Sequence, residues 1–540
     1  MCRWRSWTVA ALVGGSLSAG AAGGDVRRAG GGRTCREAEC SGDLRDASAR
    51  VAVGDLSWAK RAEALRARIE QDGFDFDEGS LETFEAQDCA EVEYCWANNP
   101  SAPYGFFLFP LGPGEPDPDP ELRGPYTGTR RSVFRLLPNE AIVLMGRTPP
   151  PSPYFSFAAY VFSRHTPIGR GAPPYDDRVE VFASIGETQN QLTLETSAGA
   201  GESAFDQETA LVITADEGTD LAIRERLRDA GFADEMINTL VLPRIGPDGV
   251  SGWARMGYAN EDDLLTVLMR VAHPDALRPG SAIRAWLDAP PVRVFRVRPP
   301  EDSQLLPFGH PPLRVRGTGE SERLAPLNRL VGGILDEYHP ACVEMELAKP
   351  ARHENGAFCL ENMIPCFADC RDTPYLGRRV QLGPGPEDAV IVAGVDHEKT
   401  GKASFVNVVL TRLSDGTGLR SVVMRDLAGS GAAYLRWHPN GDAVWYVKFA
   451  RRCDRDPYCF ELTEREAPAG SWLAVVTRAY LEPATKTAAK TTPAVDSEIV
   501  FPRIIYVDCD RTNPPDAGEL DDATDGPWTL GRAPFSLVRE

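Results

Sequence analysis

The pattern of apolar residues predicts β-strands along most of the chain. Ala141 to Met145 form an unbroken apolar run, and Gly146 follows as the predicted strand exit. The next segment alternates as a half-buried strand does, with apolar side chains at Phe155, Phe157, Ala159 and Val161. Short proline and glycine clusters such as 149–151 separate these runs, and such clusters punctuate strands more often than helices. We therefore expect a β-rich α+β protein.

Two segments instead show the spacing of amphipathic helices. In the first, Ser57 can cap a helix whose apolar positions are Ala62, Leu65 and Ile69. In the second, Pro326 suits the first helical turn. The apolar stripe that follows it comprises Leu327, Leu330, Val331, Ile334, Leu335 and Tyr338. Each predicted helix precedes a strand-rich region.

The two strand-rich regions resemble each other in sequence. Residues 138–164 align with residues 386–412 without a gap. The identical positions are Pro138/Pro386, Ala141/Ala389, Gly146/Gly394, Ser156/Ser404, Phe157/Phe405, Val161/Val409 and Arg164/Arg412. Average composition would give only about one or two identities over this length. Upstream, Cys89 and Cys95 match Cys359 and Cys366, and downstream the segment around Arg270 resembles that around Arg478. We interpret the chain as two diverged copies of one module, each an opening helix followed by antiparallel strands.

The first copy carries an apparent insert at 209–241. Ala210 to Thr214 is typical of a buried strand, Thr219 can cap a helix that runs through Arg228, and Gly231 suits the helix end. Leu240 to Leu242 would form the returning strand. The insert is therefore predicted to be a β-α-β element.

A division of the 540 residues into several regions follows from these patterns. Arg3 and Arg5, an apolar stretch and Ala19-Gly20-Ala21 are typical of a secretory signal peptide. The predicted regions are a signal peptide at 1–21, a flexible N-terminal segment at 22–50, the first module at 51–300 with its helical insert near 209–242, a linker at 301–322, the second module at 323–510 and an acidic tail at 511–540.

Cysteine usage agrees with export, because grouped cysteines in an exported chain are usually disulfide-bonded. The predicted disulfide cysteines are Cys35, Cys40, Cys89, Cys95, Cys342, Cys359, Cys366, Cys370, Cys453 and Cys459. Cys509 stands alone, and removal of Cys2 with the signal peptide leaves an odd number. The sequence does not fix the connectivity. A zinc site near Cys342 is the alternative, but the short knuckles of structural zinc sites are missing there, so we expect no metal and no cofactor.

Charge narrows the range of partners. The formal net charge is −20 and the isoelectric point is about 5.0. Such a chain repels phosphate backbones, so we expect no nucleic-acid partner. No segment after the signal peptide is long and apolar enough to cross a membrane. We therefore expect a small ligand or an extracellular partner. The protein would work in the periplasm or outside the cell.

Candidate site residues come from two patterns. His397, with Asp396 beside it, lies in the densest ionisable cluster of the repeat, and a carboxylate neighbour suits a general base. His438 is a further catalytic candidate, and an exposed charged turn is the alternative for the cluster. Four arginines end apolar strands at matching places and could bind an acidic ligand, namely Arg164, Arg270, Arg412 and Arg478. The alternative for these arginines is structural pairing with acids such as Glu140 or Asp388.

Two functions therefore stay open. The first is an exported module pair that binds a ligand between its copies. The second is a secreted hydrolase or lyase whose active site has no sequence motif, because no known nucleophile or phosphate-loop motif occurs in the chain.

Overall fold

A computed structural model describes twelve segments of the chain. They are residues 58–84, 98–118, 126–127, 129–166, 177–244, 254–276, 278–301, 303–309, 319–350, 356–435, 441–487 and 498–509. The chain divides into two compact units, Met1–Lys60 and Arg61–Glu540. The second unit is described here by itself. The predicted signal peptide, the predicted cap Ser57 and Cys35, Cys40, Cys89 and Cys95 lie outside the described residues, as does the predicted acidic tail.

The described residues up to 309, called the first half, contain two five-stranded sheets. One has the order β1 (Asp75–Glu78), β12 (Val292–Arg298), β6 (Ala141–Arg147), β9 (Glu208–Thr214), β10 (Ile237–Val241). The other has the order β2 (Ser80–Phe84), β3 (Tyr104–Leu108), β11 (Leu264–Ala272), β7 (Tyr154–His165), β8 (Arg178–Asn190). A short hairpin joins β4 (Tyr126–Thr127) to β5 (Arg130–Arg131).

The described residues from 319 onwards, called the second half, contain two more five-stranded sheets. One has the order β13 (Val343–Leu347), β22 (Arg503–Val507), β16 (Ala389–Val395), β19 (Val444–Ala450), β20 (Cys459–Glu461). The other has the order β14 (Lys349–Pro350), β15 (Tyr375–Gln381), β21 (Trp472–Tyr480), β17 (Phe405–Arg412), β18 (Thr417–Val423). Among the named strands, all pairs are antiparallel except β9 with β10 and β19 with β20.

The helices are few and mostly short. One covers residues 58–71. The others are α2 (Glu217–Asp229), α3 (Ala282–Asp288), α4 (Leu324–Leu335), α5 (Gly356–Asn362) and α6 (His397–Thr400). Single 3-10 turns occur at η3 (Asp234–Met236), η4 (Ser321–Arg323), η5 (Pro340–Cys342), η6 (Met424–Leu427), η7 (Ser430–Ala433) and η8 (Gly441–Ala443).

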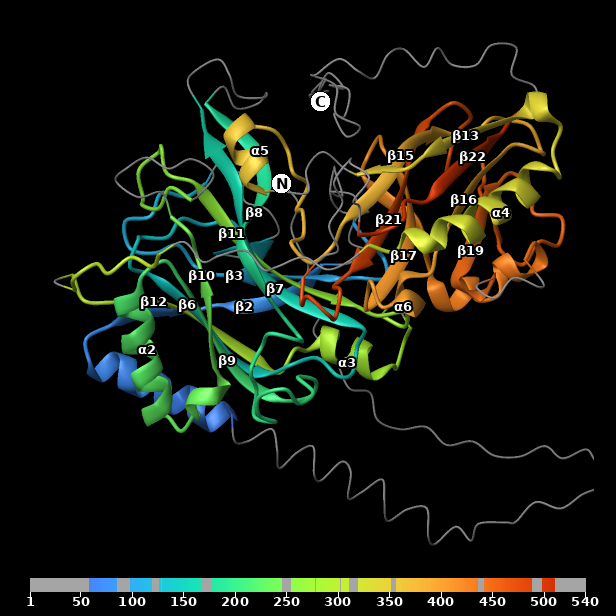
Figure 1. The fold of residues 1–540 in the computed structure, drawn as a ribbon. Coiled ribbons are helices and arrows are strands. Elements are labelled where there is room, and N and C mark those ends of the chain that lie inside the picture. Colours follow the sequence, from blue (N-terminus) through green and yellow to red (C-terminus); the bar gives the residue numbers. More distant parts are fainter. Residues whose placement is uncertain are drawn as a thin grey trace, which may run out of the picture. The chain divides into compact units, whose positions relative to one another are not determined.

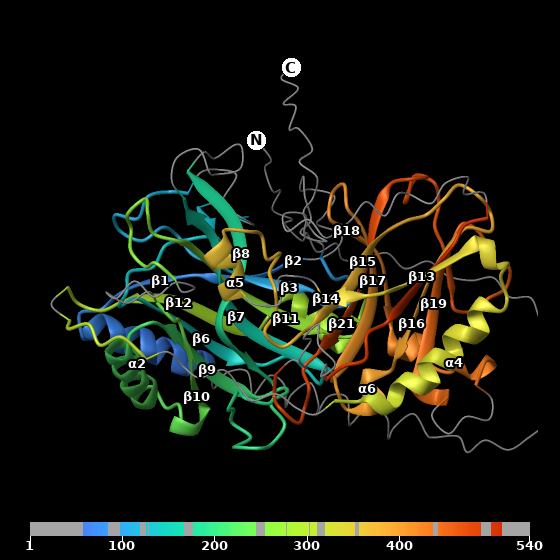
Figure 2. The ribbon, with the colours of Figure 1, turned by 45° about the horizontal axis from the view of Figure 1, so that its top comes forward.

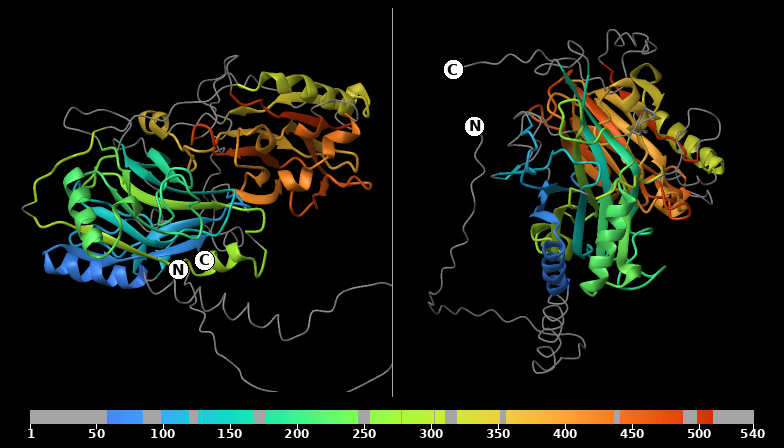
Figure 3. Two further views of the ribbon diagram at one scale, coloured as in Figure 1. Left: turned by 60° about the horizontal axis from the view of Figure 1, so that its bottom comes forward. Right: turned by 90° about the vertical axis from the view of Figure 1, so that its left-hand side faces the viewer.

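Each half builds its core between its two sheets and places a helix on one outer face. In the first half, Ile142 and Leu144 of β6 and Phe157 of β7 belong to one buried cluster. The opposite face of β6 packs in another cluster with Leu65 and with Ile223 of α2, which lies against this sheet (Figure 1). In the second half, α4 lies along the sheet that contains β16 and β19 (Figure 2), and Figure 3 shows both helices from further directions. We call these two sheets the helix-covered sheets.

The structure confirms a strand-rich mixed fold with antiparallel sheets and corrects two details of the sequence prediction. The predicted β-α-β element is present, but Asp216 caps α2 by accepting a hydrogen bond from the Thr219 amide. Thr219 therefore lies inside the helix. The parallel strand pair is also not special to the first half, because β19 and β20 are parallel as well. Only the helix between the two strands is extra.

A third correction concerns β7. All but the last of its residues are buried, whereas the alternating pattern predicted a half-buried strand. The side chains between the predicted positions, such as Tyr160 and Phe162, are buried in a second cluster on the other face of the sheet. Aromatic residues occupy both faces of β7, so both faces are buried. The alternation in the sequence therefore did not mark one face as exposed to solvent.

Three disulfides lie within the described residues. They join Cys342 to Cys509, Cys359 to Cys366 and Cys453 to Cys459. Cys509, which stands alone in the sequence, thus has a distant partner. Cys370, a predicted disulfide cysteine, has a free thiol. Its place in a buried cluster with Tyr154, Phe405 and Tyr480 explains this, because aromatic side chains rather than a second sulfur surround it.

Both ends of the predicted linker are attached to the fold. The backbone amide of Leu306 donates to Asp216 at 2.5 Å. Glu320 is buried and accepts hydrogen bonds from the amide of Val500 and the hydroxyl of Thr400. The described parts of this segment are therefore held by buried carboxylates.

Candidate functional site

The predicted catalytic cluster at His397 is part of the protein interior. The imidazole is fully buried, and its Nδ1 lies 2.8 Å from a carboxylate oxygen of Glu320. Burial would raise the pKa of Glu320, but His397 and the two hydrogen bonds described above lower it. Asp396 instead caps α6 through the amides of Glu398 and Lys399. The structure therefore does not bring Asp396 and His397 together as an acid–base pair, and His438 lies outside the described residues.

The remaining members of this loop face other groups. Glu398 accepts a hydrogen bond from the Val406 amide, and loss of hydration raises its pKa to about 7. Its side chain is nevertheless exposed, so water screens much of this effect. Lys399 donates to the carbonyl of Asp442. Within the described residues this loop is an assembly of structural contacts.

Two of the four predicted binding arginines form carboxylate pairs. Arg164 is buried and binds both oxygens of Asp263, at 3.0 and 2.8 Å. Arg412 binds both oxygens of Asp415, but this pair is partly exposed. The predicted alternative of structural pairing thus fits their positions, although the acids differ from those expected. Glu140 accepts from Arg296, and Asp388 accepts from the Gly385 amide.

The other two arginines stack on tyrosines of β3 and β15. Arg270 lies over Tyr104, and Arg478 lies over Tyr375, at 5.3 and 5.6 Å from the ring centroids. Arg270 also donates to the hydroxyl of Tyr160 and to the carbonyl of Ala368. Both guanidinium groups are buried, which keeps them from a ligand in solution.

The sheets that contain β8 and β18 share a local irregularity, and we call them the bulged sheets. Between β7 and β8 the register shifts after Val161, where Val181 and Phe182 oppose one residue of β7. Between β17 and β18 it shifts at Leu410, where Leu419 is the extra residue. In the alignment of residues 138–164 with residues 386–412, Val161 and Leu410 are one position apart. Bulges of this kind bend an edge strand and redirect its side chains.

In the first half, a segment of the second half fills the bulge. The amides of Cys366 and Ala368 donate to the carbonyls of Val181 and Phe182 at 2.7 and 2.9 Å. Asp369 accepts from both the amide and the hydroxyl of Ser184, at 2.7 and 2.5 Å. Burial raises the pKa of Asp369, and these two donors oppose that shift. The cavity nearby holds only about 20 Å³.

In the second half, the bulge receives a segment of the first half through side chains. Asn98 accepts a hydrogen bond from the Gly418 amide at 3.1 Å. The side chain of Asn99 lies between Asn407 and the hydroxyl of Tyr480, with hydrogen bonds of 2.7 and 2.8 Å. Gly418 suits this position, because a Cβ atom there would lie 2.8 Å from the Asn98 carbonyl oxygen. No main-chain pairing like that at β8 is present among these described residues.

This looser contact leaves a pocket of about 390 Å³ beside β18. The residues that line it are Pro100, Ser101, His273, Pro274, Gly418, Leu419, Arg420 and Ser421. They come from both halves. Cavities of this size are in the range that holds small molecules in proteins.

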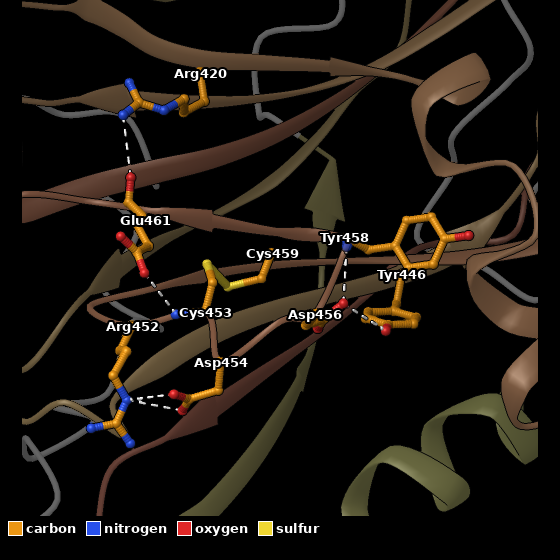
Figure 4. Close-up of a disulfide and its surroundings, with 9 residues drawn as sticks. All are labelled: Arg420, Tyr446, Arg452, Cys453, Asp454, Asp456, Tyr458, Cys459 and Glu461. Atoms are coloured by element: carbon orange, nitrogen blue, oxygen red, sulfur yellow. Dashed lines mark hydrogen bonds and ion pairs between the residues drawn. A yellow bond between two sulfur atoms is a disulfide. The ribbon is translucent and has the colours of Figure 1, made fainter.

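Arg420, the one permanently charged side chain of the lining, is already bonded. Its guanidinium donates to Glu466 at 2.6 Å and to the carbonyls of Leu419 and Glu461. Figure 4 shows Arg420 directed at Glu461, next to the disulfide between Cys453 and Cys459. Burial would raise the pKa of Glu466, but hydrogen bonds from Thr463 and Arg420 lower it to about 2, so the carboxylate remains charged.

His273 provides a neutral imidazole. Its Nδ1 accepts a hydrogen bond from the Asp275 amide at 2.9 Å, and burial lowers its pKa. The proton of the neutral ring is therefore on Nε2, which is free to donate. Sequence reasoning missed His273, Ser101 and Arg420, because they carry no motif and meet only through the exchange of segments between halves. The one available signal was His273, which follows the repeated strand containing Arg270.

Comparisons with known proteins give structural matches but no function. No protein-family model matches the chain, and no curated protein matches it. A putative uncharacterized protein from Burkholderia cenocepacia is 14% identical, with 84% of this chain and 89% of that chain covered and a TM-score of 0.36. The VPA0106 protein from Vibrio parahaemolyticus is 10% identical, with 68% and 88% covered and a TM-score of 0.30.

Proposed function

We propose that this is an exported protein made of two diverged copies of one module, and that it binds a small ligand between them. Matching strand orders support the duplication. Each half has an opening helix, a helix-covered sheet that ends in a parallel strand pair, and a bulged sheet. The residues that the sequence alignment pairs begin β6 and β16 at the same position, Ala141 and Ala389.

The disulfides of the described residues support export. Three disulfides lie in the described part of the chain, and disulfides persist in oxidising compartments. Among the described residues, no helix is both long and apolar enough to cross a membrane. Among the described cysteines, Cys370 has a free thiol; it is buried, and burial raises its pKa, so it resists oxidation there.

The observation that carries the binding proposal is that the segments docked at β8 and β18 leave different amounts of space. At β8 the docked segment leaves about 20 Å³, and at β18 it leaves about 390 Å³. A pocket of the larger size has room for a small ligand, whereas the smaller one has none. Since the same architecture closes at β8, retention of the opening at β18 favours a binding role.

A pocket-filling variant tests the proposal. Pro274 lines the pocket and has no amide proton to lose, so Pro274→Trp should occupy the space without breaking a hydrogen bond. The matched control is Pro300→Trp, at a partly buried position outside the lining. Thermal unfolding would be followed for the secreted form of each protein against a diverse library of small compounds. A bound ligand must raise the melting temperature.

We expect compounds that stabilise the wild type and Pro300→Trp in a saturable way, and no stabilisation of Pro274→Trp. If no compound in the library stabilises the wild type, or if Pro274→Trp retains every response, the β18 pocket is not a binding site.

A further inference from the structure

The β18 pocket has an unusual balance of charge, and this bears on the chemistry of its ligand. The inference below rests on the binding function proposed above. Arg420 is neutralised by Glu466 at 2.6 Å. Asp275, which follows the lining residue Pro274, pairs with Arg425 at 3.3 Å. Neither an unpaired cation nor an unpaired carboxylate therefore lines the described pocket.

A charged ligand would enter this pocket at a cost. An anion would meet no free guanidinium and would approach a chain of net charge −20. A cation would meet no free carboxylate, because removing Glu466 or Asp275 from its arginine leaves that arginine without its partner. Desolvation of an ion without a partner opposes binding. A neutral ligand avoids both costs.

The hydroxyl groups of the pocket leave one acceptor open. Ser101 Oγ lies 2.8 Å from Ser421 Oγ. Ser421 Oγ also accepts from Asn407 Nδ2 at 2.8 Å and lies 3.4 Å from Asn99 Oδ1. Whichever hydroxyl donates in the bond between Ser101 and Ser421, Ser101 Oγ keeps a lone pair free to accept.

The imidazole supplies the matching donor. Since Nδ1 of His273 is occupied by the Asp275 amide, only its Nε2–H remains for a ligand. The backbones of His273 and Ser101 are side by side, because the His273 amide donates to the Ser101 carbonyl at 3.0 Å, and both residues line the pocket. The pocket thus offers one acceptor and one donor close together. A hydroxyl group of a ligand can bind to both, since it donates and accepts through one oxygen.

The apolar part of the lining completes the description. Pro100, Pro274 and Leu419 provide aliphatic surface and no hydrogen-bond donors from their side chains. A ligand that carries hydroxyl groups on one edge and C–H groups on another matches both kinds of surface. We infer that the β18 pocket binds an uncharged sugar, with a ligand hydroxyl between Ser101 Oγ and His273 Nε2.

The test compares neutral and charged sugars on the full secreted chain. Titration calorimetry would use methyl glycosides and short neutral oligosaccharides of glucose, galactose and mannose, with glucuronate and glucosamine as charged counterparts. Neutral dipeptide amides would serve as uncharged ligands without a sugar ring. Each ligand would be titrated into wild type, Pro274→Trp, Ser101→Ala and the exposed control Ser303→Ala.

We expect at least one neutral sugar to bind wild type and Ser303→Ala equally. Ser101→Ala should weaken this binding about fivefold to tenfold, the usual effect of one hydrogen bond, and Pro274→Trp should abolish it. Binding of only charged sugars or only dipeptide amides, lost in Pro274→Trp, would overturn the sugar assignment and leave the pocket as a binding site. If none of these ligands binds while the compound library yields Pro274→Trp-sensitive hits, the sugar assignment also fails. If neither set binds, the binding function itself is wrong.

Discussion

The two bulged sheets differ most where a segment of the opposite half meets the edge strand. At β8 the contact is made by main-chain hydrogen bonds to Val181 and Phe182 and by the buried carboxylate of Asp369. At β18 it is made by the amide side chains of Asn98 and Asn99. Main-chain pairing brings two backbones close along their length, whereas side-chain contacts hold them at separate points. The same topology therefore gives a closed interior on one side and a pocket on the other.

The matched arginines show the same contrast. Arg164 and Asp263 have side-chain exposures of 3% and 0%, and Arg412 and Asp415 have 26% and 32%. Water weakens an ion pair. The two pairs have similar hydrogen bonds, but the exposed pair contributes less to stability than breaking the buried pair would cost. The arginine pair of the first bulged sheet is shielded from water, and that of the second is partly exposed to it.

The largest expected effect comes from breaking the two arginine pairs in parallel. Asp263→Asn leaves the Arg164 guanidinium buried without its counter-charge and should lower the free energy of unfolding by about 3–5 kcal/mol. Asp415→Asn should cost no more than about 1 kcal/mol. Urea denaturation of both variants measures the difference. Similar losses in the two variants would contradict the contrast between a buried and a partly exposed arginine pair.

A smaller effect is expected at the docked segments. Asp369→Ala leaves the amide and hydroxyl of Ser184 without their acceptor, and it should cost about 2–3 kcal/mol in denaturant unfolding. Asn98→Ala removes one neutral hydrogen bond to Gly418 and should cost about 1 kcal/mol. Asp369→Asn is the conservative control, because its amide oxygen can still accept from Ser184. A larger loss for Asn98→Ala than for Asp369→Ala would reverse the order of the two contacts.

The smallest effect concerns pH at the open pocket. Burial lowers the pKa of His273, so the folded state takes up a proton less readily than the unfolded chain. Its contribution is zero above the ordinary histidine pKa of about 6.5, and stability is lost as the pH falls below that value. The loss should stay under about 1 kcal/mol, because the ring is only partly buried. His273→Gln should therefore reduce the fall in melting temperature between pH 7 and pH 5.

A loss of stability larger than about 1 kcal/mol would mean that the His273 imidazole is less hydrated than its partly buried position indicates. If the wild type and His273→Gln lose the same melting temperature between pH 7 and pH 5, the pKa of His273 is not lowered in the folded protein and this prediction is wrong.

The sequence predicted what depends on local pattern. Leu327, Leu330 and Ile334 show the period of a helix, and they form the buried face of α4. Ala141 to Met145 form a continuous apolar run because β6 is buried on both faces. These features are visible in a short window, since each residue's neighbours in sequence are also its neighbours in space.

What the sequence did not reveal depends on contacts between distant segments. His397 resembles a candidate base until Glu320, 77 positions away in the printed chain, occupies its Nδ1. The pocket combines 100–101 and 273–274 with 418–421, and no local pattern links these ranges. A bulge shifts register by one residue without any motif, so the edge strands that shape the pocket were equally hidden.

The bond between Cys342 and Cys509 has a practical consequence for anyone handling the protein. It spans 167 positions and joins the residue just before β13 to a residue just after β22. A single protease cut anywhere between these cysteines leaves the two products covalently joined. A non-reducing gel would therefore show a nicked second half as an intact chain, and only a thiol would reveal the damage.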